Sequence, residues 1–533
     1  MDTRRRVYLC VGLTLTVILL TTSSSAIPAF SRQYGTSCAT CHVDFPKLND
    51  FGKAFKDAGF KFPKDDETFI KVPPVMLGSP AQSELWPHTI FPGTIPGLPP
   101  IGLRFNQFFE VTGKNANNFN SQLPGGTVGP YIPRTDFQPG FFSIFTAGNF
   151  GSDIAFWVDD DISVSGANAN GTLGDAYLRF VNVSRFFKLP TDSLTVKVGQ
   201  FELDLPFTQA RGYDISPYDI YSQANIGAQN PAYPTQFVNN SFTLAGPGRG
   251  IEISGGHHYG GYRYAIAVVD QNTSGTPPTT YLNVPSGTGG SNGGVGYFSD
   301  SNFKDLYGRF AYRFNLERDP ASRHEVQAAG ATGPRDHTYL TLGSYYFYGR
   351  SVQRTSGLLS DGTTPTVLTA REPFYRVGGD FDFNYRKLDI YGLYMYGHDK
   401  DIVPYIPPGL EGPTGFISGN PATFSGGFIQ ADYMVYPWLM TIVRWDRVNS
   451  TADYLNGIGA SASNPPPTPF FSPLSSVRNR FTPGAQFLIH ANIKASFEYQ
   501  IRPKQVVYEP GTNIQLVSPF RTNTATAALE FVY

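Results

Sequence analysis

The run Ile-Gly-Leu-Arg-Phe-Asn-Gln-Phe-Phe-Glu-Val-Thr-Gly at residues 101–113 alternates apolar and polar side chains. Successive side chains of an extended strand point to opposite faces, so the apolar set that includes Phe105 faces one way and the polar set that includes Glu110 faces the other. The last run of the chain, residues 523–533, alternates in the same manner and ends on the aromatic Tyr533. Both ends of this long region therefore predict strands with one apolar face.

Between these two runs the same kind of segment recurs, bounded by residues typical of turns. The sequence predicts sixteen strands, at residues 101–113, 140–150, 153–164, 172–185, 193–203, 249–257, 261–270, 303–315, 336–349, 374–385, 387–398, 423–436, 438–448, 480–489, 491–502 and 523–533. The aromatic content of 15% and the abundance of Gly and Pro fit strands and turns better than helices.

The connections between the predicted strands alternate in length. Tight turns are expected at residues 151–152, 258–260, 386, 437 and 490, and long links at residues 114–139, 204–248, 271–302, 350–373, 399–422, 449–479 and 503–522. Two links break the alternation, because 165–171 is short where a long loop is due and 316–335 is long where a turn is due. Short turns on one side and long loops on the other are typical of outer-membrane barrels, with the short side periplasmic.

These patterns predict a mainly β protein whose residues 101–533 form a 16-stranded antiparallel transmembrane β-barrel of the porin-like, outer-membrane type. An even strand count places both ends of the barrel on the short-turn, periplasmic side. The alternative, a water-soluble sandwich or propeller, would need an internal repeat of fixed period, and the sequence has none.

Residues 1–26 have the features of a secretory signal peptide. Arg4 to Arg6 precede the apolar run 7–20, and small residues follow up to a cleavage point after Ala26. Export to the bacterial outer membrane is therefore expected. A formal net charge of -1 and a pI near 6.7 give no electrostatic footprint for nucleic acid.

The mature chain begins with a second kind of sequence. Cys38-Ala39-Thr40-Cys41-His42 is a C-x-x-C-H motif that contains both cysteines outside the signal peptide. Two thiols at this spacing form thioethers to one haem, and the adjacent histidine binds its iron, so the motif predicts one covalently bound haem c. A redox dithiol or half of a zinc site is the alternative, but no further C-x-x-C supplies the other zinc ligands.

Residues 27–71 are predicted to form a small α-helical cytochrome c module around this haem. Leu48, Phe51, Phe55 and Ala58 recur at helical spacing, and Gly59 can end the helix in a left-handed conformation. These apolar side chains can cover a porphyrin or pack against a barrel wall.

The second axial ligand of the haem iron is open on sequence alone. Met76 is the first candidate, His88 the second, and an open or water-filled position the third. Both residues lie in a Pro-rich tether, 72–100, whose proline density predicts an extended segment without regular structure.

The residues around the motif resemble a known family. The runs 27–33, 45–49 and 51–56, together with the C-x-x-C-H motif, look like the amino-terminal signature of the outer-membrane fused monohaem cytochrome-porins, the Cyc2-like proteins. The resemblance implies one haem within a sixteen-stranded barrel, oxidation of extracellular Fe(II), and passage of the electron to a periplasmic cytochrome. It carries over to Cys38, Cys41 and His42, and more weakly to Met76.

Three functional hypotheses follow. In the first, a haem-bearing barrel, with the module folded back into the pore, oxidises extracellular Fe(II) and passes electrons to a periplasmic carrier. In the second, electrons flow outward to an extracellular acceptor. In the third, the chain is a diffusion porin whose haem module is a plug or a redox sensor. No catalytic residue is predicted; Asp159 to Asp161 are either oxygen ligands for Fe(II) or a solvated charge cluster, and His257 and His258 lie at a predicted periplasmic turn.

Overall fold

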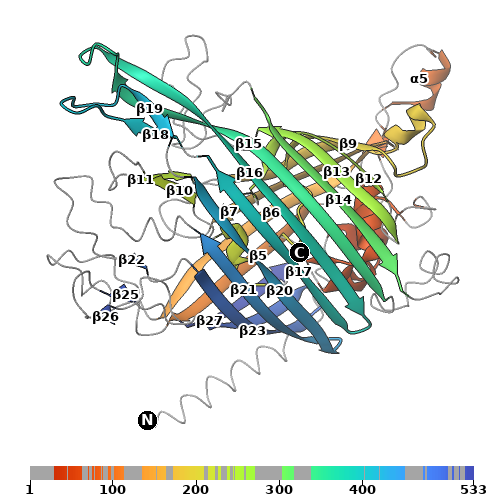
Figure 1. Cartoon of the computed structure of the whole chain (residues 1–533). Helices are drawn as coiled ribbons and strands as arrows, with labels where there is room; N and C mark the ends of the chain where they lie inside the picture. The colour runs from red at the N-terminus through yellow and green to blue at the C-terminus, as the bar shows by residue number, and fades with distance from the viewer. Residues whose placement is uncertain are drawn as a thin grey trace, which may run out of the picture.

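Sixteen antiparallel strands close into one barrel (Figure 1). The structure is a computed structural model and describes residues 29–44, 46–62, 66, 70, 75–76, 78–85, 87, 94–95, 97, 101–112, 135–151, 153–163, 172–208, 214–222, 226–229, 237–240, 244, 246–256, 260–270, 303–316, 338–400, 402–418, 421–450, 472–473, 477–501, 507–508, 515–516 and 523–533. Residues 1–26, predicted to be a signal peptide, and the pair His257 and His258 lie outside the described residues.

The barrel strands follow chain order around the ring, and β9 pairs with β12 across one long connection. They are β5 (Ile101–Thr112), β6 (Thr135–Phe150), β7 (Ile154–Ser163), β8 (Thr172–Phe180), β9 (Thr195–Phe201), β12 (Gly248–Gly256), β13 (Gly261–Asp270), β14 (Asp305–Asn315), β15 (Tyr339–Leu358), β16 (Pro365–Tyr385), β17 (Leu388–Asp399), β20 (Ala422–Tyr436), β21 (Leu439–Ser450), β23 (Val477–His490), β24 (Ile493–Gln500) and β27 (Thr524–Val532). The ring closes where β27 pairs with β5. Each barrel strand overlaps one predicted from the sequence, so the prediction of a 16-stranded antiparallel barrel is confirmed.

The wall is apolar outside and charged inside. On β21, Val443 and Trp445 are exposed on the outer face, whereas Arg444 and Asp446 are completely buried on the inner face. This inverts the pattern of a protein whose outer surface is solvated by water. It matches a barrel whose outer band faces lipid, because closure pairs the backbone polar groups between strands and leaves no open edge. Among the described residues, no helix is long and apolar enough to cross a bilayer.

The two ends of the barrel differ as the sequence predicts. The short-turn end carries the tight connections around Gly151, Arg386 and Trp438, and the long-loop end carries most of the long connections. Of the two predicted exceptions, the links 165–171 and 316–335, only Leu316 lies within the described residues. One short-turn link is longer than predicted, because β8 ends at Phe180 and the 3-10 helix η3 (Val183–Phe187) follows before β9.

Two predicted irregular segments contain regular structure. The expected loop 350–373 is largely strand, because β15 and β16 stay paired from Tyr339↔Asn384 to Leu358↔Pro365 and extend past the neighbouring strands. In the Pro-rich tether, the helix α5 (Pro80–Leu85) begins at Pro80, where proline is tolerated because its missing N–H has no helical partner. Short strand pairs complete the fold: β3 (Val75–Met76) with β4 (Thr94–Ile95), β10 (Ile226–Gln229) with β11 (Phe237–Asn240), β18 (Ile402–Tyr405) with β19 (Gly415–Ser418), and β22 (Ser472–Pro473) with β25 (Val507–Tyr508) and β26 (Gln515–Leu516).

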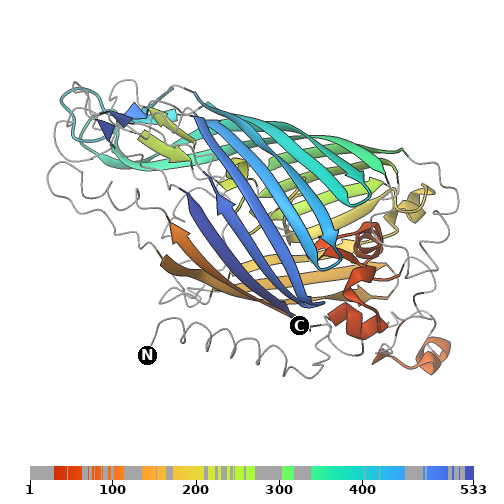
Figure 2. The same ribbon diagram turned by 90° about the horizontal axis from the view of Figure 1, so that it is seen from below.

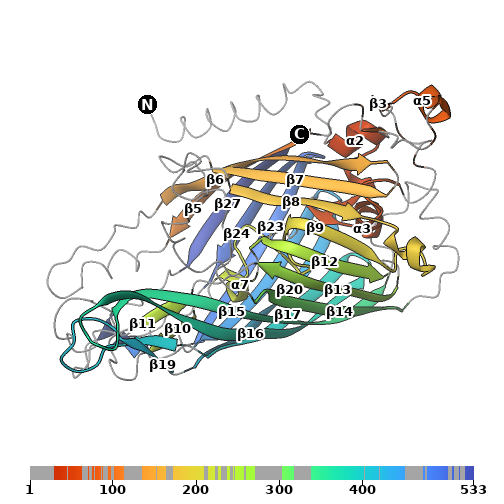
Figure 3. The same ribbon diagram turned by 90° about the horizontal axis from the view of Figure 1, so that it is seen from above.

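The connection after β9 enters the lumen instead of remaining outside. The first described stretches of this connection, residues 202–208 and 214–222, are called here the inner segment and include the short helix α7 (Asp219–Ser222), drawn within the barrel in Figure 3. Its far part reaches β20 to β24, across the barrel from β9 in the closed strand order. The prediction of an external loop at 204–248 is therefore wrong for these residues.

Two buried arginines hold the far part of the inner segment. Arg444 lies 3.3 Å from Asp214 and donates to the Ser216 carbonyl oxygen at 3.1 Å. Arg480 donates to the Pro217 carbonyl oxygen at 2.6 Å and pairs with Asp219 at 3.2 Å. Buried charges of this kind require partners, which the lumen-facing strands and the inner segment supply to each other.

Aromatic side chains fill the lumen around the inner segment. Tyr218 stacks on Phe428 with ring centroids 3.8 Å apart, and Phe207 stacks on Tyr391 at 4.6 Å. Both stacks belong to the largest buried apolar cluster, which also includes Phe201 and Leu203. At this level the lumen is packed with protein rather than lined by solvated side chains.

Arg444→Ala tests this packing. The substitution leaves Asp214 and Asp446 buried without that cation, so we expect a loss of about 3 to 5 kcal/mol from the free energy of unfolding. Urea titration followed by tryptophan fluorescence measures the loss, and planar-bilayer conductance should rise as the inner segment leaves the wall. Arg447→Ala is the control, because Arg447 lies on the same strand and faces outward. An equal loss of stability and an equal rise in conductance for the two substitutions would contradict the packed lumen.

Candidate functional site

Residues 29–62 form a compact N-terminal module inside the short-turn end of the barrel (Figure 2). In order, it contains α2 (Ala29–Tyr34), η1 (Cys38–Thr40), β1 (His42–Asp44), β2 (Lys47–Leu48) and α3 (Asp50–Asp57). The C-x-x-C-H motif occupies η1 and the start of β1.

The local backbone gives the two cysteines a common orientation. η1 is a single 3-10 turn, closed by a hydrogen bond of 3.2 Å from the Cys41 N–H to the Cys38 carbonyl oxygen. Residues three apart in such a turn lie above one another, so both thiols are presented on one side. The cysteines are not joined in a disulfide and remain partly exposed. Burial raises the pKa of Cys41 to about 12, so its thiol is protonated at neutral pH.

His42 has a fixed ring orientation. Its Nδ1 lies 3.2 Å from the carbonyl oxygen of Pro46, in the turn between β1 and β2. When this nitrogen donates to the carbonyl, Nε2 is the unprotonated nitrogen and is available as a ligand. Burial lowers the pKa of His42 to about 4, which keeps the ring neutral.

Asn49 and Gly52 attach α3 to the motif. Asn49 caps the helix by accepting from the Gly52 N–H at 2.8 Å, and its side-chain amide donates to the carbonyl oxygens of Ala39 and Thr40 at 3.2 and 3.1 Å. A Cβ at position 52 would lie 2.1 Å from the Cys41 carbonyl oxygen. The first turn of α3 can therefore approach the motif this closely only with glycine at position 52.

An aromatic cluster forms the core of the module. Phe55 on α3 packs edge-on against Phe30 and Tyr34 of α2, and Phe60 stacks on Phe30 at 5.4 Å. Gly59 has a φ of 82°, so the predicted left-handed helix end is confirmed. Of the apolar residues predicted for this helix, Phe51 and Phe55 lie on α3 and pack on aromatic rings of the module, whereas Leu48 lies before the helix, on β2. Phe60 stacks on Trp157 of β7 and so joins the module to the barrel wall.

Ion pairs join the module to strands around the ring. Lys47 pairs with Asp389 of β17, and Asp50 pairs with Arg313 of β14 at 2.7 Å. Asp57 pairs with Arg179 of β8 at 2.9 Å. On the other side of the mouth, Arg32 donates to the Ile101 carbonyl oxygen at 2.7 Å. Contacts on well-separated strands hold the module within the wall rather than beside it.

One residue connects the module with the inner segment. Arg263 of β13 donates to Asp57 at 3.0 Å and to both carboxylate oxygens of Asp204 at 3.2 Å. Asp204 follows β9, and its carbonyl oxygen accepts from the Tyr307 hydroxyl at 2.7 Å. The module and the inner segment are therefore neighbouring layers in one filled lumen.

The described residues among the other candidates lie on other elements than the motif. Met76, on β3, has 52% of its surface exposed, and His88 lies outside the described residues. Asp159 and Asp160 are on β7, where Asp159 accepts from the Asp175 N–H. Across the described ranges, no three His, Cys, Asp or Glu side chains gather as a metal site.

Sequence reasoning missed the residues that seat the module. In the sequence, nothing distinguishes Asp57 and Lys47 from charged residues exposed to solvent, because their partners lie far along the chain. Asn49 had a readable signal, because an Asn directly before a helix with an acidic first turn is a good N-cap. The close approach of Gly52 to Cys41 had none, since it depends on how the motif folds back over α3.

Comparison with known proteins returns distant structural similarity only. No protein-family model matches the sequence. No curated protein matches it either. Similar solved structures include the trimer form of the outer-membrane protein OmpT of Vibrio cholerae, with 7% identity, 81% of this chain and 98% of that chain covered, and a TM-score of 0.40. OmpF of Salmonella typhi in complex with daunomycin has 10% identity, with 81% of this chain and 97% of that chain covered and a TM-score of 0.41. OprB of Pseudomonas putida at high pH has 9% identity, with 81% of this chain and 94% of that chain covered and a TM-score of 0.42. Similarity this distant adds nothing to what the closed sheet itself establishes.

Gly52→Ala tests the close contact between α3 and the C-x-x-C-H motif. The added methyl carbon collides with the Cys41 carbonyl, so α3 must move away and the module should loosen. Limited trypsin digestion of the protein in detergent should then cleave after Lys53 and Lys56 at least several times faster than in the parent chain. Ala54→Gly, in the same helix, is the control for a general loss of helix stability, because it lowers helix propensity while keeping both cleavage sites. An unchanged cleavage rate in Gly52→Ala would show that the helix does not depend on this close approach.

Proposed function

We propose that this chain is an outer-membrane barrel that holds one covalently attached haem c in its short-turn mouth and transfers electrons across the outer membrane. The observation that carries the proposal is the position of the C-x-x-C-H motif, which is held within the barrel wall by ion pairs to several strands. The amino-terminal resemblance to the fused monohaem cytochrome-porins points the same way.

The residues present fit the cofactor. Cys38 and Cys41 are free thiols on one side of a single turn, and His42 has one ring nitrogen engaged by Pro46 and the other available. Bound there, a haem would supply an iron that accepts and releases one electron. Met76 and His88 are the candidates for the second axial ligand, and Met76 on its exposed strand is accessible for such a role.

The surrounding wall provides what electron transfer across a membrane requires. The apolar band of an outer-membrane barrel is about 25 Å tall, so a redox centre outside the barrel would leave most of that distance unbridged. The module instead lies inside the lumen, next to the inner segment, and the wall separates both from lipid. We propose extracellular Fe(II) as the electron donor and a periplasmic cytochrome as the acceptor, with outward transfer to an extracellular acceptor as the reverse case.

A diffusion porin with a plug is the second candidate. The observation that favours it is the strand number, because sixteen-stranded barrels are wide enough for an aqueous channel. Against it stand Arg444 and Asp446, which line the lumen and yet are completely buried, as they would not be in an open channel. The packing of the lumen therefore argues against a permanently open channel, and a plugged porin shares it with the electron-transfer protein that we propose.

Cofactor attachment is tested by mass. The mature parent chain, expressed with a haem-attachment system and denatured, should carry the added mass of one haem. Cys38→Ser and Cys41→Ser should each leave a single thioether and lower the fraction of chains that carry haem, and the double substitution should remove the added mass entirely. Ser37→Ala, beside the motif, is the control, and a parent chain without added mass would overturn the cofactor assignment.

Function is tested on the same preparation. Stopped-flow mixing with Fe(II) should produce the spectrum of a reduced c-type haem in the parent protein, and His42→Ala should slow or abolish that change. Liposome swelling with sugars separates the second candidate. Rapid swelling without haem reduction, at acidic and neutral pH, would favour the diffusion porin and contradict electron transfer from Fe(II).

A further inference from the structure

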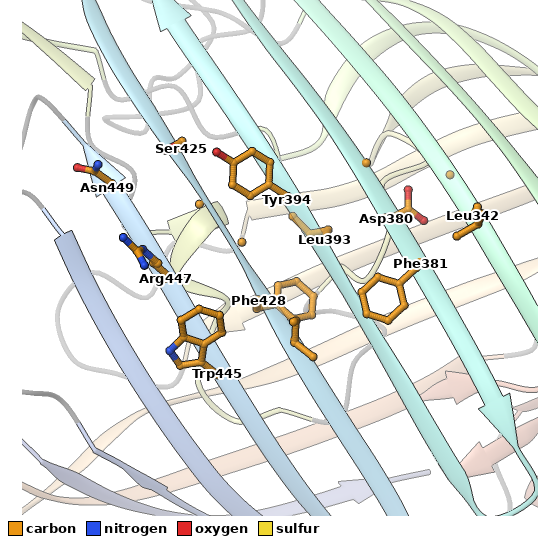
Figure 4. Close-up of a pocket in the computed structure, with 15 residues that line it drawn as sticks. Leu342, Asp380, Phe381, Leu393, Tyr394, Ser425, Phe428, Trp445, Arg447 and Asn449 are labelled. Atoms are coloured by element: carbon orange, nitrogen blue, oxygen red, sulfur yellow. The ribbon is translucent and has the colours of Figure 1, made fainter.

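A groove of about 690 Å³ lies on the wall formed by β15, β16, β17, β20 and β21. Its floor includes two glycines at outward-facing positions, Gly379 and Gly427, where the absence of side chains hollows the sheet. Tyr394 and Trp445 flank it, as Figure 4 shows, and both are exposed on the outer face of the barrel. The groove therefore opens on the side of the wall that faces lipid.

One end of the groove is polar. Along β21, the outward-facing residues run from Trp445 through Arg447 to Asn449, toward the long-loop end, and Ser425 lies beside them on β20 (Figure 4). Arg447 is exposed, whereas Arg444 on the inner face of the same strand is completely buried. In the part of the chain that the structure describes, no carboxylate lies within 4.0 Å of the Arg447 guanidinium.

A cation on the lipid-facing side of the wall is stable only near the membrane surface. An arginine on the lipid face costs about 2 to 4 kcal/mol at the bilayer midplane and about 0 to 1 near the interface, so Arg447 is tolerated only close to the headgroups. Guanidinium groups bind phosphate oxygens through charge-assisted, often bidentate hydrogen bonds. A largely apolar groove that ends in a guanidinium therefore matches an amphiphile with a phosphate head group.

We infer that this groove binds one phosphate-bearing lipid of the leaflet at the long-loop end, with its acyl chain along the glycine floor and its phosphate on Arg447. The inference rests on the proposed membrane placement of the barrel and is independent of the haem. A second copy of this chain is the competing occupant. Charge complementarity favours the lipid, because none of the described carboxylates lies within 4.0 Å of the Arg447 guanidinium, and Asp380, the acidic residue of the lining, is buried and paired with Arg309.

Native mass spectrometry of the full barrel in detergent tests the headgroup contact. The probes are phosphatidylglycerol and a neutral digalactosyl lipid with the same acyl chains. We expect the parent protein to retain one phosphatidylglycerol, and R447Q to weaken that retention about tenfold while leaving the neutral lipid unaffected. R249Q, which changes an exposed arginine on β12 across the barrel, is the control and should behave as the parent.

Gly379→Leu tests the groove itself. A Cβ at position 379 would meet only the Gly343 carbonyl oxygen, at 3.6 Å, so the substitution fits the fold while filling the groove. It should weaken retention of both lipids. Equal phosphatidylglycerol retention by the parent, R447Q and Gly379→Leu would overturn the inference. Dissociation of an oligomer by R447Q would assign the groove to a second copy instead. Haem content measured on the same variants should stay unchanged, which separates this result from the test of the proposed function.

Discussion

Closure of the sheet is the constraint on which the rest of the structure depends. The last strand, β27, pairs with the first, β5, so no barrel edge is left with unpaired backbone groups. Once the ring is closed, alternate side chains along each strand must face lipid or the lumen. Apolar residues such as Trp445 take the outer face, and charged residues such as Arg444 are confined to the interior.

Charges confined to the lumen need partners, and the chain supplies them from two other regions. The inner segment brings Asp214 and Asp219 to the arginines of β21 and β23, and the module brings Asp50 and Asp57 to arginines of β8, β13 and β14. Arg263 serves both layers at once. The filled lumen is therefore an electrostatic consequence of the closed wall, and it places the C-x-x-C-H motif inside the barrel rather than beside it.

This arrangement separates two roles that a barrel of this size can have. A wide ring lined by solvated side chains passes small solutes, whereas a ring packed by a module and an inner segment can hold a redox group away from lipid. The module is compact because the Asn49 cap, the close approach of Gly52 to Cys41 and the aromatic cluster around Phe55 hold its elements together. Ion pairs between its outer charged side chains and the barrel strands fix its position.

The sequence by itself determined the strands, their number and the two kinds of connection, because alternation and turn composition are local properties. It also identified Cys38, Cys41 and His42, since their spacing alone suggests the chemistry, and that assignment stays a prediction. Only the tertiary structure decided that the inner segment enters the lumen, that β15 and β16 continue as one long hairpin, and that Asp57 and Asp204 share Arg263. These features depend on contacts between residues far apart in the chain, and only the closed barrel brings such residues together.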